Sequence, residues 1–222
     1  MEPSTDNGWG RSAWSFLHCL TLDERSTVEN KRHQRHLLFL LKALLPCREC
    51  RGSYQNIYNS LSPSKVAAGI GEDDVGDLVC RIHEQVNIKL QKPAAAIPCE
   101  KWKVYHLKRC KANSYMYGLF QDDMFFFLFT LVSNYPALWS QGTQIGKKYV
   151  DFFTTLSKAL PNEQLSRLFQ DYIKTNPLDN ISNRREFQEW LYNLYIMCTP
   201  QVHALDLTTI LETMDAMRIK IK

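Results

Sequence analysis

The chain has 222 residues, of which 45% are hydrophobic and 23% are charged, and its formal net charge is +4. These values suit a globular protein with one sizeable core or two small ones. The mild charge, spread along the chain, gives no reason to expect a nucleic-acid partner, and the longest apolar run, 124–132, is too short to predict a membrane span.

Apolar residues recur at three- and four-residue spacing through nearly the whole chain, which predicts an all-α protein. We expect helices at 14–22, 30–45, 47–61, 74–90 and 99–109, and then at 122–133, 147–159, 163–174, 184–197 and 205–217. Proline and glycine interrupt this pattern at 62–71 and 93–98. A boundary near residue 112 would divide the chain into domains 1–112 and 113–222.

A Cys-x-x-Cys pair, Cys47 and Cys50, follows a proline at a predicted helix start. Two thiols at this spacing can cycle between dithiol and disulfide, and the positive potential of a helix N-terminus favours a thiolate at Cys47. The polar N-terminus has no secretory-signal pattern, so the seven cysteines indicate redox or metal chemistry rather than a secreted disulfide scaffold. Taken alone, the pair leaves redox chemistry, metal binding and coincidence open.

Aromatic and polar side chains flank the cysteine pair on two other predicted helices. Trp14 and His18 lie four residues apart, so an indole and an imidazole project from one helix face. His83 and Asn87 have the same spacing on a later helix that ends in lysines. Rings that stack, polar groups that bond ring edges and lysines that meet phosphate suit a planar, anionic cofactor. Core packing and an ordinary surface face are the alternatives.

In this order, the motifs resemble the Erv/ALR family of FAD-dependent sulfhydryl oxidases. The family pattern is Trp-x-x-Leu-His, then Pro-Cys-x-x-Cys with an aromatic residue four positions on, then His-Asn-x-Val-Asn-x-x-Leu-Gly-Lys-Pro. Here the pattern reads WSFLH at 14–18, PCREC at 46–50 with Tyr54, and HEQVNIKLQKP at 83–93. The resemblance covers residues 8–110, with Glu84 in place of the usual Asn and Gln91 in place of the usual Gly.

The resemblance implies a bundle of four or five helices that holds FAD beside Cys50, while Cys47 exchanges disulfides with substrate thiols. Oxygen would be the final electron acceptor, giving hydrogen peroxide. The residues that the resemblance assigns to FAD binding are Arg11, Trp14, His18, Tyr54, His83, Asn87, Lys89 and Lys92. Trp102 is a candidate for the late aromatic residue that covers the adenine, and no metal is expected.

The resemblance also gives roles to the other cysteines. It implies a structural disulfide between Cys99 and Cys110, with two free thiols as the alternative. Cys19, Cys80 and Cys198 fall on apolar helix faces, which predicts buried and inert thiols.

The second half of the chain parallels the first in sequence. Segments 125–129, 158–162 and 190–195 correspond to 14–18, 43–47 and 78–83 at offsets of 111, 115 and 112. This alignment replaces His18, Cys47, Cys50 and His83 by Phe129, Asn162, Leu165 and Tyr195. We therefore expect residues 113–222 to form a degenerate, flavin-free helical copy that mimics a partner subunit, with chance likeness as the alternative.

The resemblance further implies thiol-containing protein substrates or a small redox carrier protein as partners, and a homodimer. An extra helical half without a targeting signal resembles the versions encoded by large DNA viruses, which predicts the host cytoplasm or the virion. The mitochondrial intermembrane space is the alternative. The rival function is a helical interaction module with a zinc site built from Cys47, Cys50 and a histidine such as His83.

Overall fold

The structure is a computed structural model that describes residues 9–61, 75–92, 98–112, 117–135, 143–199 and 206–216. The first half contains α1 (Trp9–Leu22), α2 (Val28–Leu44), α3 (Arg48–Leu61), α5 (Val75–Lys89) and α6 (Cys99–Ala112). The second half contains α7 (Tyr117–Ser133), α8 (Gln144–Ala159), α9 (Glu163–Thr175), the 3-10 turn η3 (Leu178–Asn180), α10 (Arg184–Cys198) and α11 (Leu207–Ala216). The described residues contain no strand, so the predicted all-α class is confirmed.

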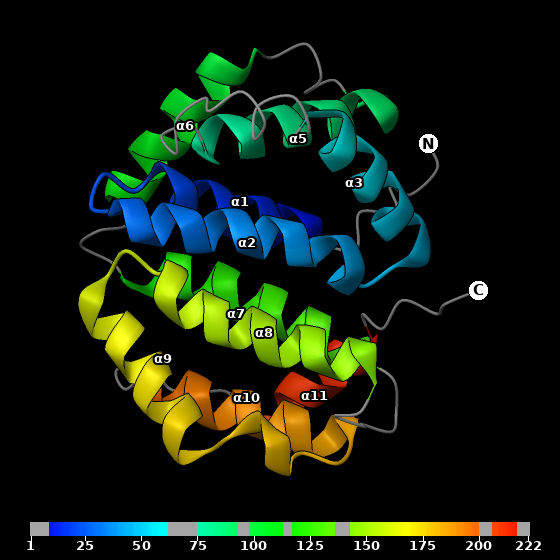
Figure 1. The fold of residues 1–222 in the computed structure, drawn as a ribbon, viewed down its shortest axis with the longest axis vertical. Coiled ribbons are helices and arrows are strands. Elements are labelled where there is room, and N and C mark those ends of the chain that lie inside the picture. The colour runs from blue at the N-terminus through cyan, green and yellow to red at the C-terminus, as the bar shows by residue number, and fades with distance from the viewer. Residues whose placement is uncertain are drawn as a thin grey trace.

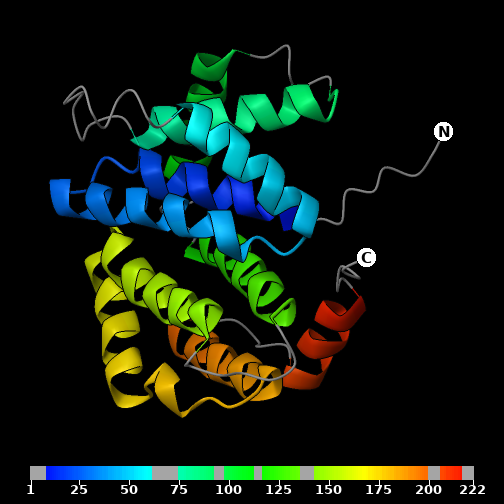
Figure 2. The ribbon, with the colours of Figure 1, turned by 45° about the vertical axis from the view of Figure 1, so that its right-hand side comes forward.

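The helices stack in layers along the long axis of the molecule (Figure 1). α3, α5 and α6 form one outer layer, α1 with α2 and α7 with α8 form the two central layers, and α9, α10 and α11 form the other outer layer. Figure 2 shows the same order after a 45° turn. α2 packs along α8 and α1 along α7, and these are the most extensive helix contacts in the described residues. The two halves of the chain therefore meet face to face through their central layers.

Side-chain caps fix where several helices begin. The Thr27 hydroxyl accepts the Asn30 N–H, and the Asn30 side chain accepts the Thr27 N–H in return, which starts α2. Thr143, Asn162 and Asn183 cap α8, α9 and α10 through their side-chain oxygens. A short polar side chain at this position bonds an N–H group that has no partner within its own helix. These caps fix where the chain leaves a loop and begins the next helix.

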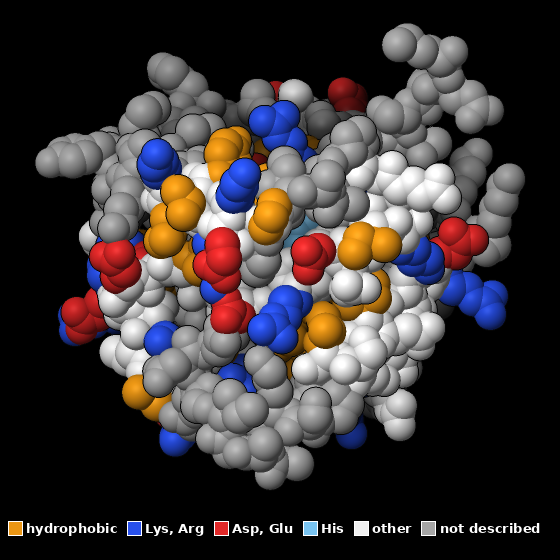
Figure 3. Space-filling model, turned by 90° about the horizontal axis from the view of Figure 1, so that it is seen from above, with side chains coloured by type: hydrophobic (Ala, Val, Ile, Leu, Met, Phe, Trp, Pro, Cys, Tyr) orange, Lys and Arg blue, Asp and Glu red, His pale blue; other side chains and the backbone are white. Residues whose placement is uncertain are grey.

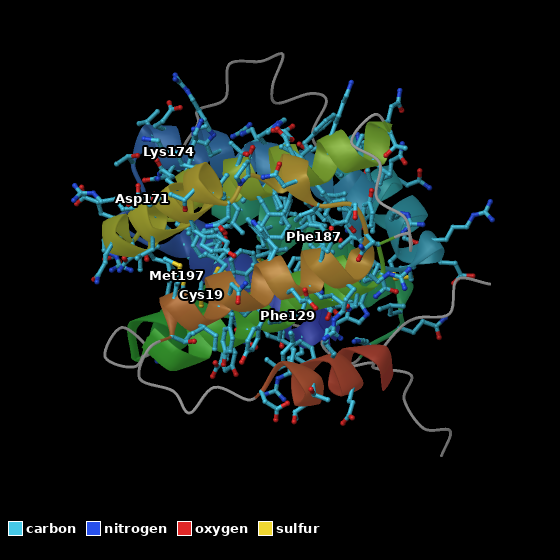
Figure 4. All side chains as sticks on the ribbon, turned by 90° about the horizontal axis from the view of Figure 1, so that it is seen from below. Cys19, Phe129, Asp171, Lys174, Phe187 and Met197 are labelled. Atoms are coloured by element: carbon cyan, nitrogen blue, oxygen red, sulfur yellow. A yellow bond between two sulfur atoms is a disulfide. The ribbon has the colours of Figure 1, made fainter. Side chains whose placement is uncertain are left out.

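α7 explains the long apolar run at 124–132. It packs against α1 on one side and against α10 and α11 on others, so almost every face of the helix is buried. Phe129 on α7 and Phe187 on α10 are both buried, and Figure 4 labels them. A helix enclosed in this way is apolar all round. Among the described residues, no helix has the length and hydropathy to cross a membrane.

Two buried polar residues hold the central layers together. The Gln34 amide on α2 donates to the carbonyl of Leu20 on α1, at 3.0 Å, and lies 3.1 Å from the carbonyl of Ala159 at the end of α8. The Tyr149 hydroxyl on α8 donates to the carbonyl of Leu131 on α7 at 2.9 Å. Buried polar groups need such partners, because an unmade hydrogen bond costs about 1–3 kcal/mol. Gln34 thus joins the first half to the second.

Candidate functional site

Cys47 and Cys50 are joined by a disulfide at the corner between α2 and α3. Because α3 begins at Arg48, Cys47 stands at the capping position, and its sulfur accepts the Cys50 N–H at 2.9 Å. Both cysteines are half-buried. The helix start predicted for this pair is therefore present, with the positive end of the helix dipole at Cys47.

Five rings from three helices form what we call the ring cluster: Trp14 and His18 on α1, His83 on α5, and Trp102 and His106 on α6. Trp14 stacks on His83 with ring centroids 4.2 Å apart, and His18 stacks on His106 at 4.1 Å. Trp102 closes the cluster, 5.3 Å from His83 and 5.6 Å from His106. The cluster brings together rings that are far apart in the sequence, from Trp14 to His106.

The imidazoles of His18 and His83 in the ring cluster are held neutral. Burial lowers the pKa of His18 well below its ordinary value, and the neighbouring His106 and His83 lower it further. Burial also lowers the pKa of His83 to about 3, with added contributions from His106 and Lys92. His18 Nε2 and His83 Nδ1 lie 3.0 Å apart, a hydrogen bond that requires one nitrogen to be a donor and the other an acceptor. Neutral rings meet this requirement.

Three buried polar atoms at the ring cluster have no hydrogen-bond partner in the described structure: His18 Nδ1, Asn87 Nδ2 and Trp102 Nε1. Asn87 lies one helical turn after His83 on α5. Native proteins bond almost all such atoms, since each orphan costs about 1–3 kcal/mol. Three orphans at one aromatic cluster indicate a place where a bound molecule supplies the missing partners.

The other predicted cofactor residues take different positions. The Tyr54 hydroxyl donates to the carbonyl of Leu38 at 3.0 Å, and burial raises the Tyr54 pKa. Its described contacts anchor α3 on α2 rather than reaching the ring cluster. Arg11 is exposed on α1, and the Lys89 ammonium donates to the Ser53 hydroxyl on α3.

Lys92 lies near enough to His83 for its charge to lower the pKa of that imidazole. It follows Gln91, which has a left-handed backbone with φ of 52°. The Lys92 N–H bonds the Asn87 carbonyl and the Gln91 N–H bonds the Ile88 carbonyl, both at 3.0 Å. This is the hydrogen-bond pattern of a helix end that usually carries glycine. Glycine would adopt the backbone conformation of Gln91 at less cost.

Sequence reasoning missed His106. It is buried and stacks on His18, yet it lies outside the motifs that carry the family resemblance. One signal was present in the sequence, because His106 follows Trp102 by four residues, just as His18 follows Trp14.

The expectation of inert thiols was wrong for two of three cysteines. Cys19 (labelled in Figure 4) and Cys80 are both disulfide-bonded. Cys198 is free and buried, and burial raises its pKa to about 12, so its thiol is inert as predicted. The side chains of Cys99 and Cys110 lie outside the described residues, and their pairing stays a prediction.

Figure 3 views the outer face over α5 and α6, where apolar side chains lie among basic and acidic ones. The exposed large apolar residues here are Ile88 on α5, Leu90 just after α5, and Val104 and Tyr105 on α6. A partner that meets the described part of this face would therefore make mixed apolar and charged contacts.

Comparison with protein families matches residues 11–107 to the Erv1 / Alr family. The matched range contains Cys47, Cys50 and the ring cluster. FAD-linked sulfhydryl oxidase ERV1 of Arabidopsis thaliana is 31% identical over 101 residues, which are 45% of this chain and 50% of that protein. The rice protein of the same name is 29% identical over 101 residues, 45% of this chain and 49% of the relative. Mitochondrial FAD-linked sulfhydryl oxidase ERV1 of Saccharomyces cerevisiae is 24% identical over 105 residues, which are 46% of this chain and 52% of that protein.

The chain therefore spans about half the length of the relatives it matches. The comparison with solved structures gave no significant match.

Proposed function

We propose that this protein is an FAD-dependent sulfhydryl oxidase that forms disulfide bonds in thiol-containing substrates, with oxygen as electron acceptor and hydrogen peroxide as product. One combination carries the proposal. The range that matches the Erv1 / Alr family contains a disulfide pair at a helix start together with a buried ring cluster whose polar atoms lack partners. The first feature suits thiol exchange, and the second suits a planar cofactor.

The ring cluster fits FAD. Trp14, His83 and Trp102 offer flat aromatic surface, and the orphaned atoms of His18 and Asn87 offer bonds to ring edges. The relatives are named FAD-linked oxidases. When bound, FAD accepts two electrons from a dithiol and passes them to oxygen. Lys92 near the cluster and Lys89 beside Ser53 are the cations that would meet its phosphates, and Arg11 and Tyr54 stay proposed contacts.

The cysteine pair performs the thiol exchange. A substrate thiolate attacks Cys47 Sγ, the Cys47–Cys50 bond breaks, and Cys50 leaves as a thiolate. A second substrate thiolate then attacks the substrate sulfur of this mixed disulfide, and Cys47 leaves as a thiolate. Two substrate thiols have then become one disulfide, and the Cys47–Cys50 pair holds the two electrons until it is reoxidised.

Oxygen consumption with a dithiol substrate tests the proposal. Cys50→Ala should abolish the consumption while FAD stays bound, because the thiol that is oxidised inside the protein is lost. Cys198→Ala, which removes the free buried thiol of the second half, should keep the wild-type rate. Turnover that survives in Cys50→Ala would contradict the proposal. The zinc alternative predicts instead a colourless protein that contains zinc.

We further propose that residues 113–222 are a degenerate copy of residues 1–112 that takes the place of a partner subunit. Corresponding helices support this, since α1 packs on its counterpart α7 and α2 on its counterpart α8, the arrangement of a two-fold interface. Corresponding hydrogen bonds support it as well. The Gln34 side chain donates to the Leu20 carbonyl, and the Tyr149 side chain donates to the Leu131 carbonyl. Tyr149 is 115 positions after Gln34, and Leu131 is 111 positions after Leu20.

A homodimer stays a proposal, and because α7 and α8 already cover α1 and α2, a second copy would use another face. Light scattering of the purified protein tests it. The partners we propose are protein thiols or a small redox carrier. The compartment also stays a proposal, with the host cytoplasm as for viral versions, or the mitochondrial intermembrane space. The name of the yeast relative places that protein in mitochondria.

A further inference from the structure

A guanidinium closes the corner that carries the cysteine pair. Arg51 Nη1 donates to the carbonyl of Leu45 at 2.7 Å and lies 3.5 Å from the carbonyl of Pro46. These two carbonyls come directly before Cys47, and Arg51 is the fourth residue after it. The side chain therefore folds back across the first turn of α3. Carbonyls at a helix end have no partner within the helix, so a donor from outside satisfies them.

The corresponding corner of the second half is closed without a charge. The Asn30 amide lies 2.8 Å from the Lys158 carbonyl and 3.4 Å from the Leu160 carbonyl, at the end of α8. Ser166, which stands 115 positions after Arg51, donates its hydroxyl to the Ser157 carbonyl at 2.7 Å. Neutral donors thus suffice for this type of corner. A cation is found at the corner that contains the disulfide.

The surroundings of Arg51 leave its charge effective. Arg51 is half-buried, whereas Arg48 and Glu49 on the same helix are exposed and screened by water. From the second half, Tyr149 lies within electrostatic reach of both Arg51 and Arg184. Burial raises the Tyr149 pKa, so this phenol stays neutral and does not cancel the positive charge.

From α5, the Lys89 ammonium donates to the Ser53 hydroxyl on α3. Lys89 is exposed, so water screens its charge as well. Arg48, Glu49 and Lys89 are exposed, whereas Arg51 is half-buried and bonded to the backbone next to Cys47.

We propose that Arg51 is a positioning residue that stabilises the Cys47 thiolate. The inference rests on the proposed oxidase function and concerns the step in which Cys47 departs from the mixed disulfide. A thiol of lower pKa leaves faster, and nearby arginines lower thiol pKa values. Arg51 also fixes the Leu45 and Pro46 carbonyls, so it holds the backbone from which Cys47 projects.

The test measures the rate at which iodoacetamide alkylates Cys47 in the anaerobically reduced protein, as a function of pH, with peptide mass spectrometry to identify the site. Arg51→Gln keeps a donor for Leu45 but removes the charge, as in the neutral corner of the second half. We expect it to raise the apparent pKa of Cys47 by about 0.5–1 unit, which slows alkylation at pH 7 about 3- to 10-fold. Arg51→Lys, which keeps the charge, should recover most of the wild-type rate.

Arg167→Gln is the matched control, since Arg167 is an exposed arginine on α9 and pairs with Glu163. It should leave the Cys47 pKa unchanged. An unchanged pKa in Arg51→Gln, or an equal rise in Arg51→Lys, would overturn the inference, because the side chain would then act through structure alone. Should Arg51→Gln fail to fold by circular dichroism, Arg51→Met replaces it.

The thiol titration does not depend on flavin. A protein that contains no FAD and consumes no oxygen would reject the oxidase proposal whatever the pKa of Cys47. A flavoprotein with full turnover and an unshifted Cys47 would reject the role of Arg51 alone.

Discussion

Cys47 and Asn162 cap corresponding helices with corresponding contacts. The Cys47 sulfur accepts the N–H of Cys50, three residues on, at 2.9 Å, and Asn162 Oδ1 accepts the N–H of Leu165, three residues on, at 2.8 Å. Each residue follows a leucine and a proline that end the preceding helix. The two helices therefore begin with the same type of cap. At Cys47 the capping atom is also the reactive atom.

Asn162→Ala should lower the free energy of unfolding by about 1 kcal/mol, because α9 loses its side-chain cap. Asn162→Asp keeps an acceptor oxygen and adds a favourable charge at the helix start, so it should retain the wild-type stability or exceed it. Urea unfolding followed by circular dichroism measures both variants. Equal stability of Asn162→Ala and the wild type would show that the cap contributes nothing.

Gln91→Gly should raise the free energy of unfolding by about 0.5–1 kcal/mol. The φ of Gln91 is 52°, a conformation that costs a residue with a Cβ atom about 1 kcal/mol and costs glycine little. Gln85→Gly is the control, since Gln85 is exposed in the middle of α5 and glycine there should lower stability by about 1 kcal/mol. A loss of stability in Gln91→Gly would contradict the strain at this helix end.

Acid should destabilise the protein through the histidines of the ring cluster. His83 has a pKa of about 3 when folded and an ordinary value near 6.5 when unfolded, so the unfolded chain binds more protons between these pH values. The contribution of His83 is fully present above about pH 6.5 and is lost as the pH falls toward 3, by up to about 1.4 kcal/mol per pH unit. His18 acts in the same direction.

Urea midpoints between pH 7 and pH 4 measure this dependence. In His83→Phe the slope of the unfolding free energy against pH should decrease by an amount that corresponds to at most one bound proton. This holds even if the free energy of unfolding at pH 7 also changes. His36→Gln is the control, because His36 is exposed on α2. A slope that His83→Phe leaves unchanged would show that His83 is not buried in its neutral form.

Gln34→Leu should lower the free energy of unfolding by about 1–3 kcal/mol, because the buried carbonyls of Leu20 and Ala159 lose their donor. Since Gln34 connects the two halves, flavin release and the loss of helical circular dichroism should shift together to lower urea concentration. A variant as stable as the wild type would contradict it.

Helix positions were predictable from the sequence because they depend on local periodicity. Every predicted helix has a counterpart in the structure, and the largest shifts are at α1 and α7, which begin five residues earlier than 14 and 122. The cysteine pair could be placed at a helix start for the same reason, since Pro46 ends the preceding pattern.

Contacts between helices were much less predictable. His106 joins the ring cluster only because α6 packs against α1, and the bonded state of Cys19 and Cys80 was not visible in their helix pattern. Arg51 looked like an ordinary helix residue until its side chain was seen to fold back on Leu45. Periodicity tells which face of a helix is buried, but not which residues of another helix will meet it.

The visible spectrum of the purified protein, before and after anaerobic addition of dithiothreitol, tests the central claim most directly. We expect a yellow protein whose flavin absorbance is bleached by the dithiol and returns when oxygen is admitted, because Cys47 and Cys50 would pass electrons to FAD held at the ring cluster. A colourless protein, or a flavin band that dithiothreitol leaves unchanged, would contradict the account.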